Sequence, residues 1–144
     1  MAGFNSLEEC LDWVSMMTPR LISEFHLKIV SKLSVKFAEM KPLHLGEVTY
    51  NKEEQELHFI ISLNTCLVLK KDILSVLLHE LIHVHVWCQM LMTDNKPLAL
   101  QMAIDNAKHE GLFADKCREV GFAGPFTSTR AKPALQKRLL ELDI

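Results

Sequence analysis

The sequence predicts a single α+β domain. Apolar residues recur at helical spacing toward both ends of the chain, alternate with polar residues between residues 35 and 63, and then fill a long helix nearly all round. The chain has 144 residues, 49% hydrophobic and 24% charged, an ordinary globular composition with enough apolar residues to bury one core. We therefore expect one domain over residues 1–144, with N-terminal helices, a small three-stranded antiparallel sheet, a buried central helix and C-terminal helices.

Two helices are expected before the sheet. Ser6, followed three residues later by Glu9, fits a capping box, and the apolar residues behind it predict a helix over residues 6–17. The Thr-Pro pair at residues 18–19 suits the cap and first turn of a second helix, whose apolar stripe continues to Leu33.

Three strands are expected where the periodicity changes. Alternating residues favour strands at 35–37 and 45–50, and a segment rich in Ile and Phe favours a third at 57–63. The polar residues 51–55 predict a turn between the last two strands. An antiparallel sheet is the simplest arrangement of three short consecutive strands.

The next helix, expected over residues 72–92 with Asp72 as its cap, is apolar nearly all round. Such a helix is expected to be buried. It nevertheless contains three histidines and one glutamate: His79, His83, His85 and Glu80. Burying polar side chains without partners costs free energy, so this conflict indicates a functional site.

More helices are expected after the central one. Glycine, proline and apolar spacing predicts helices over residues 95–108 and 133–142, and a shorter one between Gly111 and Gly121. A loop is expected after residues 124–125. The final helix is expected to pack three leucines on the domain: Leu135, Leu139 and Leu142.

The central helix carries the pattern H-E-x-x-H. His79 and His83 lie four residues apart, so their rings lie one above the other on one face and can take adjacent corners of a zinc tetrahedron. Glu80 lies about 100° round the helix from His79, close enough to act as a general base. Zinc lowers the pKa of its bound water to about 7, so the carboxylate can pass a proton to a leaving amine. The pattern therefore predicts a zinc site that hydrolyses peptide bonds.

The third ligand lies outside this helix. The extended pattern H-E-x-x-H-x-x-G-x-x-H fails, because Val86 and Gln89 occupy the positions of the glycine and the last histidine. His85 lies about 200° round the helix from His83 and is expected to pack or to support a ligand rather than to bind the metal itself. We expect His109, at a helix break, to be the third ligand. Three carboxylates are the alternatives: Glu110, Asp115 and Glu119.

Four segments of the chain resemble the SprT-like metalloprotease family. They are Gly46 to Tyr50 with the pattern G-x-x-x-Y, then Ile61-Ser62-Leu63-Asn64, then Leu77-Leu78-His79-Glu80-Leu81-Ile82-His83, and His109 with Phe113 four residues on. The resemblance spans about residues 20–122, leaves residues 123–144 as a C-terminal tail, and implies a zincin-like fold. It implies a Zn²⁺ ion held by His79, His83 and His109, with Glu80 as the catalytic base.

The resemblance also implies a substrate. An endopeptidase acting on protein is expected, and because the family includes a protease of DNA–protein crosslinks, DNA-associated protein is one expected substrate class. The chain departs from the family pattern where Glu110 separates His109 from the glycine that usually follows directly. The segment between His83 and His109 is also longer, and no zinc ribbon is present.

Two other interpretations remain open at this stage. The metal could only stabilise a non-catalytic binding module, although an intact Glu80 argues against this. A nucleic-acid adaptor could use residues 111–144, which carry six Lys and Arg against four Asp and Glu, but the net charge of −2 makes direct DNA binding the weakest expectation. Three side chains are candidates for stabilising the tetrahedral oxyanion: Tyr50, His58 and Arg118.

The sequence also bears on location. Its four cysteines form no C-x-x-C pair, which favours buried thiols in a reducing compartment. The N-terminus lacks the features of a signal peptide, and no apolar run reaches membrane-spanning length without a charge or a histidine. We expect a cytoplasmic protein, or a nuclear one in a eukaryote, that is neither secreted nor bound to a membrane.

Overall fold

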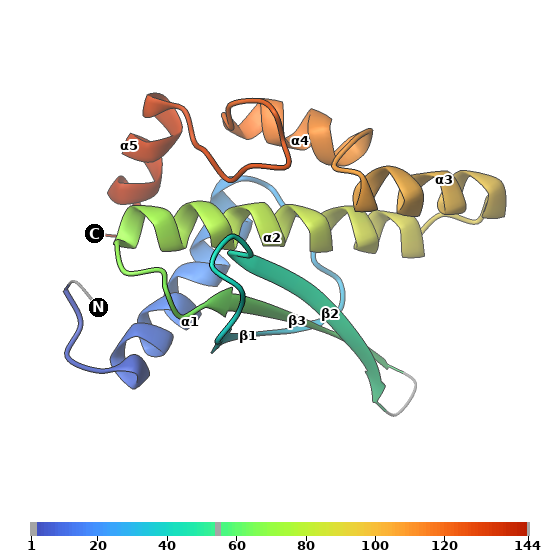
Figure 1. Cartoon of the computed structure of the whole chain (residues 1–144). Helices are drawn as coiled ribbons and strands as arrows, with labels where there is room; N and C mark the ends of the chain where they lie inside the picture. The colour runs from blue at the N-terminus through green and yellow to red at the C-terminus, as the bar shows by residue number, and fades with distance from the viewer. Residues whose placement is uncertain (1–2, 54–55, 144) are drawn as a thin grey trace.

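A long central helix organises the molecule, and most other elements pack around it (Figure 1). The structure is a computed structural model that describes residues 3–53 and 56–143. In chain order its elements are α1 (Leu7–Glu24), β1 (Lys32–Ala38), β2 (Gly46–Glu53), β3 (Glu56–Asn64), α2 (Lys70–Leu91), α3 (Lys96–Ala107), α4 (Leu112–Val120) and α5 (Pro133–Glu141). The fold is α+β, as the sequence predicts.

The three strands form a mixed sheet in the order β1-β3-β2. β2 pairs with β3 antiparallel, as expected, but β1 pairs with β3 parallel, so the prediction of an all-antiparallel sheet is wrong. β3 is the most buried strand and takes the centre, whereas β1 alternates between exposed and partly buried residues. Alternation predicts that strands exist but does not specify which edges pair. Residues 51–53 of the expected turn belong to β2, and residues 54–55 lie outside the described residues.

The N-terminal region holds one helix where two are expected. α1 continues through Pro19, which is exposed together with Ser15, so the backbone hydrogen bond lost at proline falls on the solvated side. The helix ends at Glu24 with Phe25 as its cap, and the next residue, His26, has a left-handed φ of 52°. The Leu27 N–H donates to the Ile22 carbonyl at 2.9 Å. This is a Schellman-type end without its usual glycine, which explains why the expected continuation to Leu33 is wrong.

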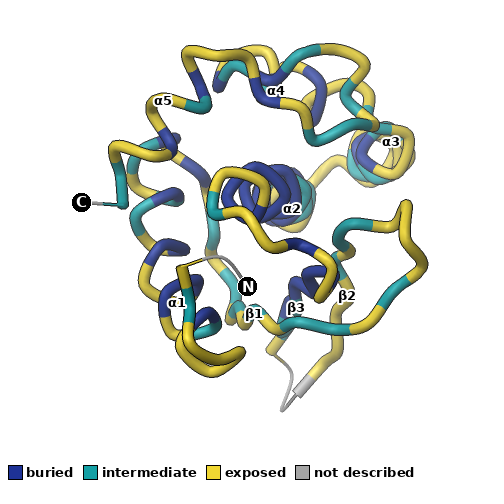
Figure 2. The backbone as a smooth tube through the Cα atoms, turned by 60° about the vertical axis from the view of Figure 1, so that its left-hand side comes forward, coloured by how far each residue is buried: buried dark blue, intermediate teal, exposed yellow. Residues whose placement is uncertain are grey.

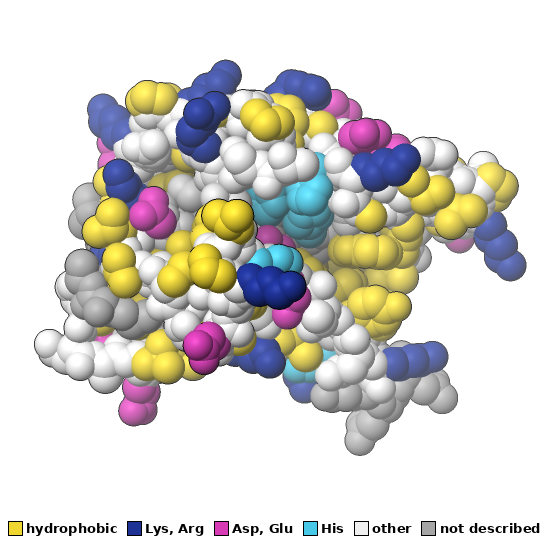
Figure 3. All heavy atoms as spheres, viewed as in Figure 1, with side chains coloured by type: hydrophobic (Ala, Val, Ile, Leu, Met, Phe, Trp, Pro, Cys, Tyr) yellow, Lys and Arg dark blue, Asp and Glu magenta, His cyan; other side chains and the backbone are white. Residues whose placement is uncertain are grey.

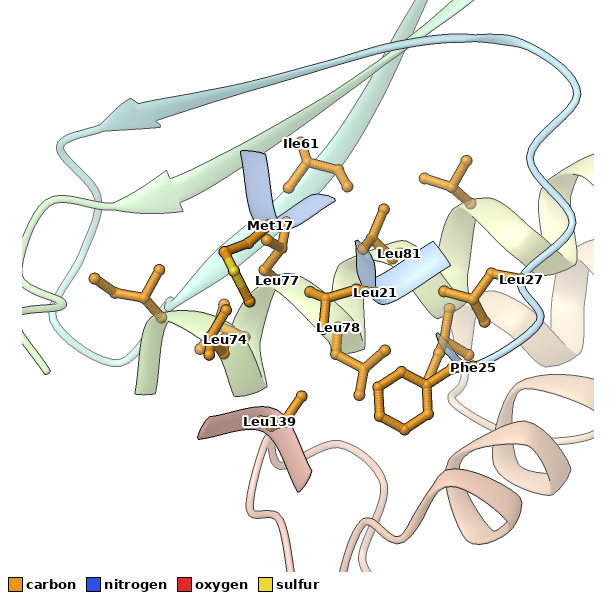
Figure 4. Packing of buried hydrophobic residues seen from close by; sticks show 14 of the residues in the cluster. Met17, Leu21, Phe25, Leu27, Ile61, Leu74, Leu77, Leu78, Leu81 and Leu139 are labelled. Carbon is orange, nitrogen blue, oxygen red and sulfur yellow. The ribbon is translucent and has the colours of Figure 1, made fainter. Parts of the chain in front are cut away.

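The central helix α2 is buried along most of its length, as predicted (Figure 2). It begins at Lys70 with Leu69 as its cap, so Asp72 lies in the first turn instead of capping the helix. Its leucines meet Met17 and Leu21 of α1, Ile61 of β3 and Leu139 of α5 in the core (Figure 4). Among the described helices it is long and apolar enough to cross a membrane, but 78% of that window is buried inside the protein.

The C-terminal helices close over the other side of α2 (Figure 1). Leu135 and Leu139 of α5 are buried and Leu142 is half-buried, which confirms their predicted packing. Arg138 Nε lies 2.9 Å from Glu24 Oε1 and ties α5 to the end of α1. The connection between α4 and α5 forms a bridge between Phe122 and Ala131 and lies over α2.

Candidate metal centre

Three histidines from two parts of the chain meet above the middle of α2. His79 and His83 lie one turn apart on α2, with ring centroids 5.1 Å apart. His109, which follows α3, places its ring 5.4 Å from that of His79 and 4.8 Å from that of His83. One ligand nitrogen from each ring lies within 4.8 Å of the other two. The structure therefore brings together the three histidines that the sequence predicts as ligands.

A tight turn after α3 directs His109 toward α2. His109 has a φ of 61°, and the Glu110 N–H donates to the Asp105 carbonyl at 2.8 Å. Gly111 also has a positive φ of 59°, and a Cβ atom there would lie 2.8 Å from Asp105 Oδ2. Glycine is therefore required at residue 111. The turn includes Glu110 and directs His109 to the cluster.

Phe113 of α4 forms an apolar wall against all three rings. It is fully buried and stacks on His83, with centroids 4.0 Å apart and planes at 17°. It meets the edges of His79 and His109, each at 5.1 Å between centroids. These contacts fix the orientation of the rings and limit the access of water to one side of the cluster.

Burial keeps the histidines neutral. It lowers the pKa of His79 to about 3 and that of His83 to about 4, and it also lowers the pKa of His109. Mutual repulsion adds to the shift at His79 because the other two rings would also be charged. A neutral imidazole offers a lone pair to a metal, whereas a protonated one does not. The three rings are therefore ready to accept a cation near neutral pH.

The three histidine nitrogens suit a tetrahedral zinc ion. Tetrahedral zinc with bonds of 2.0–2.1 Å to histidine places the nitrogens about 3.4 Å apart, which small ring movements can reach from the observed arrangement. The Nδ1 atom of His79 is buried and has no hydrogen-bond partner among the described residues. A buried, unsatisfied polar atom of this kind is accounted for by a bound ion, a water or a functional role.

Glu80 lies beside the cluster and is itself only 6% exposed. Burial raises the pKa of its carboxyl to about 8, and the nearby Glu47 carboxylate adds to the shift. A carboxyl with a pKa near neutrality can both accept and donate a proton at working pH. Its environment therefore suits proton transfer rather than a surface role.

The cluster opens into a cleft of about 910 Å³. One side is residues 43–48, which comprise the segment before β2 and the start of that strand. The floor is the face of α2 from Lys71 to Trp87. The opposite side is the end of α3 and the loop 127–131. Histidine side chains are visible in the hollow on this face of the molecule (Figure 3). Residues from the expected C-terminal tail thus form one side of the site.

The alternative ligands do not join the three histidines. Asp115 pairs with Arg118 at 3.0 Å, Glu119 pairs with Lys116, and Glu110 is exposed. None of these three carboxylates belongs to the group of potential metal ligands found among the described residues.

His85 has a packing role, as predicted. Its Nδ1 accepts a hydrogen bond from the Lys28 N–H at 2.6 Å, on the side of α2 away from the cleft lining. This bond fastens the segment between α1 and β1 to the central helix.

None of the three candidates for oxyanion stabilisation lines the cleft. Tyr50 is 64% exposed and leans on Phe59, and His58 contacts the Ser34 hydroxyl at 2.6 Å. The Arg118 guanidinium lies over the Phe126 ring. The structure does not bring these side chains to the site.

Sequence reasoning missed two residues of the site. Asn106, buried on α3, lies 2.9 Å from the His83 ring, and Glu47 affects the pKa of Glu80. A buried asparagine near a helix end gives no distinctive pattern. The position of Asn106 three residues before His109 is the one signal that links it to the site.

Comparison of the chain with protein-family models, with curated proteins and with solved structures finds no match in any of the three. The geometry of the site is therefore the basis for any functional assignment.

Proposed function

We propose that this protein is a zinc-dependent endopeptidase of the SprT-like type. The observation that carries the proposal is the arrangement of three neutral histidines beside a buried carboxylate on the floor of an open cleft. His79, His83 and His109 would hold the metal, and Glu80 would serve as general base. Three protein ligands and a free fourth position are typical of catalytic zinc sites.

The proposed chemistry divides between the metal and the chain. Bound zinc supplies Lewis acidity and activates water at neutral pH. Glu80 takes the proton from the attacking water and delivers it to the leaving amine, a transfer for which its raised pKa is suited. Phe113 shields one side of the histidines from water, which strengthens the electrostatic interactions in the site.

The cleft suits an extended peptide. β2 is an edge strand of the sheet, so its outer edge carries backbone groups that β3 does not pair. The segment leading into β2 forms one side of the cleft, and a substrate strand can add to such an edge through main-chain hydrogen bonds. The proposed substrate is therefore unfolded or locally extended protein.

DNA-associated protein is the substrate class that the family resemblance favours. The basic residues of the C-terminal region offer limited support for direct DNA binding, because four of them already lie in ion pairs: Lys116, Arg118, Lys137 and Arg138. Neutralised charges contribute less to phosphate binding. We therefore propose that the cleft binds the protein substrate and not the DNA associated with it.

The alternative is a module in which zinc only secures the fold. Structural zinc sites are closed by four protein ligands, whereas the group found among the described residues has three. A structural site also has no need of a carboxylate whose pKa is tuned toward neutrality. Both features favour catalysis over a structural role.

Glu80→Gln tests the proposal. The zinc-loaded variant should keep its metal and its fold but lose at least about a hundredfold in cleavage of a denatured protein, because the proton acceptor is gone. Glu110→Gln, an exposed change next to a proposed ligand, is the control and should cleave normally. Equal cleavage by Glu80→Gln and wild type would remove the catalytic assignment.

A further inference from the structure

Asn106 of α3 joins its helix to the backbone and the ring of His83. Its side chain is 1% exposed, although α3 buries little else. Its Oδ1 atom lies 2.9 Å from His83 Nδ1, and its Nδ2 atom lies 3.2 Å from the His83 carbonyl oxygen. Both polar ends of this amide therefore contact one and the same residue.

The pair of contacts fixes which nitrogen of His83 carries the proton. A carbonyl oxygen only accepts hydrogen bonds, so the atom of Asn106 that faces it must be the donating Nδ2. The other end of the amide is then Oδ1, which only accepts, so His83 Nδ1 must donate. In a neutral imidazole the lone pair is then on Nε2. The amide thus selects one of the two tautomers.

This selection prepares His83 to bind a metal. Because Nδ1 keeps its proton, Nε2 is the nitrogen available to the centre shared with His79 and His109. A hydrogen bond to the non-ligating nitrogen also restricts rotation of the ring.

We propose that Asn106 is a positioning residue that holds His83 in its Nδ1–H tautomer with Nε2 ready to bind zinc. Asn106 also lies three residues before His109, so the end of α3 supplies both a ligand and the support for another ligand. The part that concerns zinc affinity rests on the proposed function. The tautomer does not, because it follows from the hydrogen bonds of the metal-free protein.

The tautomer is measured first, in the metal-free protein, by long-range ¹H–¹⁵N correlation spectra of the histidine rings. Wild type should show His83 protonated at Nδ1. Asn106→Asp should show the same, because its carboxylate still accepts from Nδ1, although it no longer donates to the His83 carbonyl. Asn106→Leu, which accepts no hydrogen bond, should lose this preference. An Nε2–H ring in the wild type, or an unchanged ring in Asn106→Leu, would overturn the proposal.

Zinc affinity is measured next, by competition with a chromophoric chelator. Loss of such a hydrogen-bonding partner typically weakens binding about 10–100-fold, and we expect this for Asn106→Leu but a change of only a few-fold for Asn106→Asp. Met102→Ala is the matched control, because Met102 is the other buried residue of α3 and its sulfur accepts a hydrogen bond from the Thr93 hydroxyl.

Met102→Ala should loosen α3 while keeping zinc affinity within a few-fold of wild type. An equal loss of affinity in Met102→Ala and Asn106→Leu would mean that packing of α3, not the hydrogen bond, supports the site, and would overturn the positioning role. If wild type binds no zinc, the proposed function is wrong. The NMR measurement of the His83 tautomer still tests the role of Asn106 in that case, because it is made without metal.

Discussion

Gly46 lies against Glu80 with no room for a side chain between them. A Cβ atom on Gly46 would lie 3.2 Å from Glu80 Oε1, 3.1 Å from Glu80 Cγ and 2.9 Å from Val76 Cγ1. The first residue of β2 therefore touches the proposed general base directly. The position of the carboxylate depends on how closely the strand approaches α2.

Gly46→Ala should therefore damage both stability and cleavage. Inserting a methyl group into a packed contact typically costs about 1–3 kcal/mol, and here the displaced groups are the side chains of Val76 and Glu80. Urea denaturation and peptide cleavage measure the two effects. Gly124→Ala is the control, since a Cβ atom there would meet nothing within 4 Å. Full activity in Gly46→Ala would show that the contact does not position the carboxylate.

His109→Ala should bind zinc far more weakly, because it removes one of three proposed ligands. Metal content after gel filtration should fall well below one zinc per chain. Asp115→Ala is the comparison, since Asp115 pairs with Arg118 and should leave zinc binding unchanged. Full retention of zinc in His109→Ala would transfer the role to a carboxylate such as Glu110 or Asp115.

The metal-free protein should lose stability at higher pH because of Glu80. Burial raises the pKa of this carboxyl to about 8, so its contribution to stability is fully present below its unfolded pKa and is lost as pH rises through about 8. The glutamine side chain of Glu80→Gln does not titrate. The free energy of unfolding of this variant minus that of wild type should therefore increase with pH.

Denaturation with chelator present, at about pH 5 and about pH 8, measures that difference, and the titrating histidines cancel because both proteins contain them. Glu110→Gln, the same change at an exposed position, is measured as the control. A difference between Glu80→Gln and wild type that does not change with pH would contradict the burial of a titrating carboxyl.

Leu139→Ala should destabilise the protein by about 2–5 kcal/mol, the usual cost of emptying a fully buried leucine site. Leu140→Ala, one residue away and 47% exposed, should change the free energy of unfolding by no more than about 0.5 kcal/mol. Thermal or urea unfolding compares them. Equal, small effects would mean that α5 is not docked on the core.

The spacing of residues in the sequence predicts those features of the fold that lie within a single helix. The buried α2, and the placement of His79 and His83 on one face, follow from a spacing of four residues. Strand pairing depends on contacts between distant segments, so the parallel pairing of β1 with β3 left no signal in either strand.

The residues of the site that lie outside α2 could be predicted only in part, for the same reason. His109 could be predicted because a histidine at a helix break, close to a glycine that lets the chain turn, can complete a zinc site. Asn106, in contrast, is one of many polar residues on helices. Its function depends on the docking of α3 against α2, which brings its amide to the His83 ring. The sequence alone does not specify that contact.

The number of zinc ions bound per chain tests the proposed metal centre most directly. Wild type and a His79→Ala, His83→Ala double variant are equilibrated with zinc, freed of excess metal and analysed for metal and protein. We expect about one zinc per chain in wild type and essentially none in the variant, with both proteins folded by circular dichroism. No zinc in wild type, or equal zinc in both, would contradict a metal centre at these histidines.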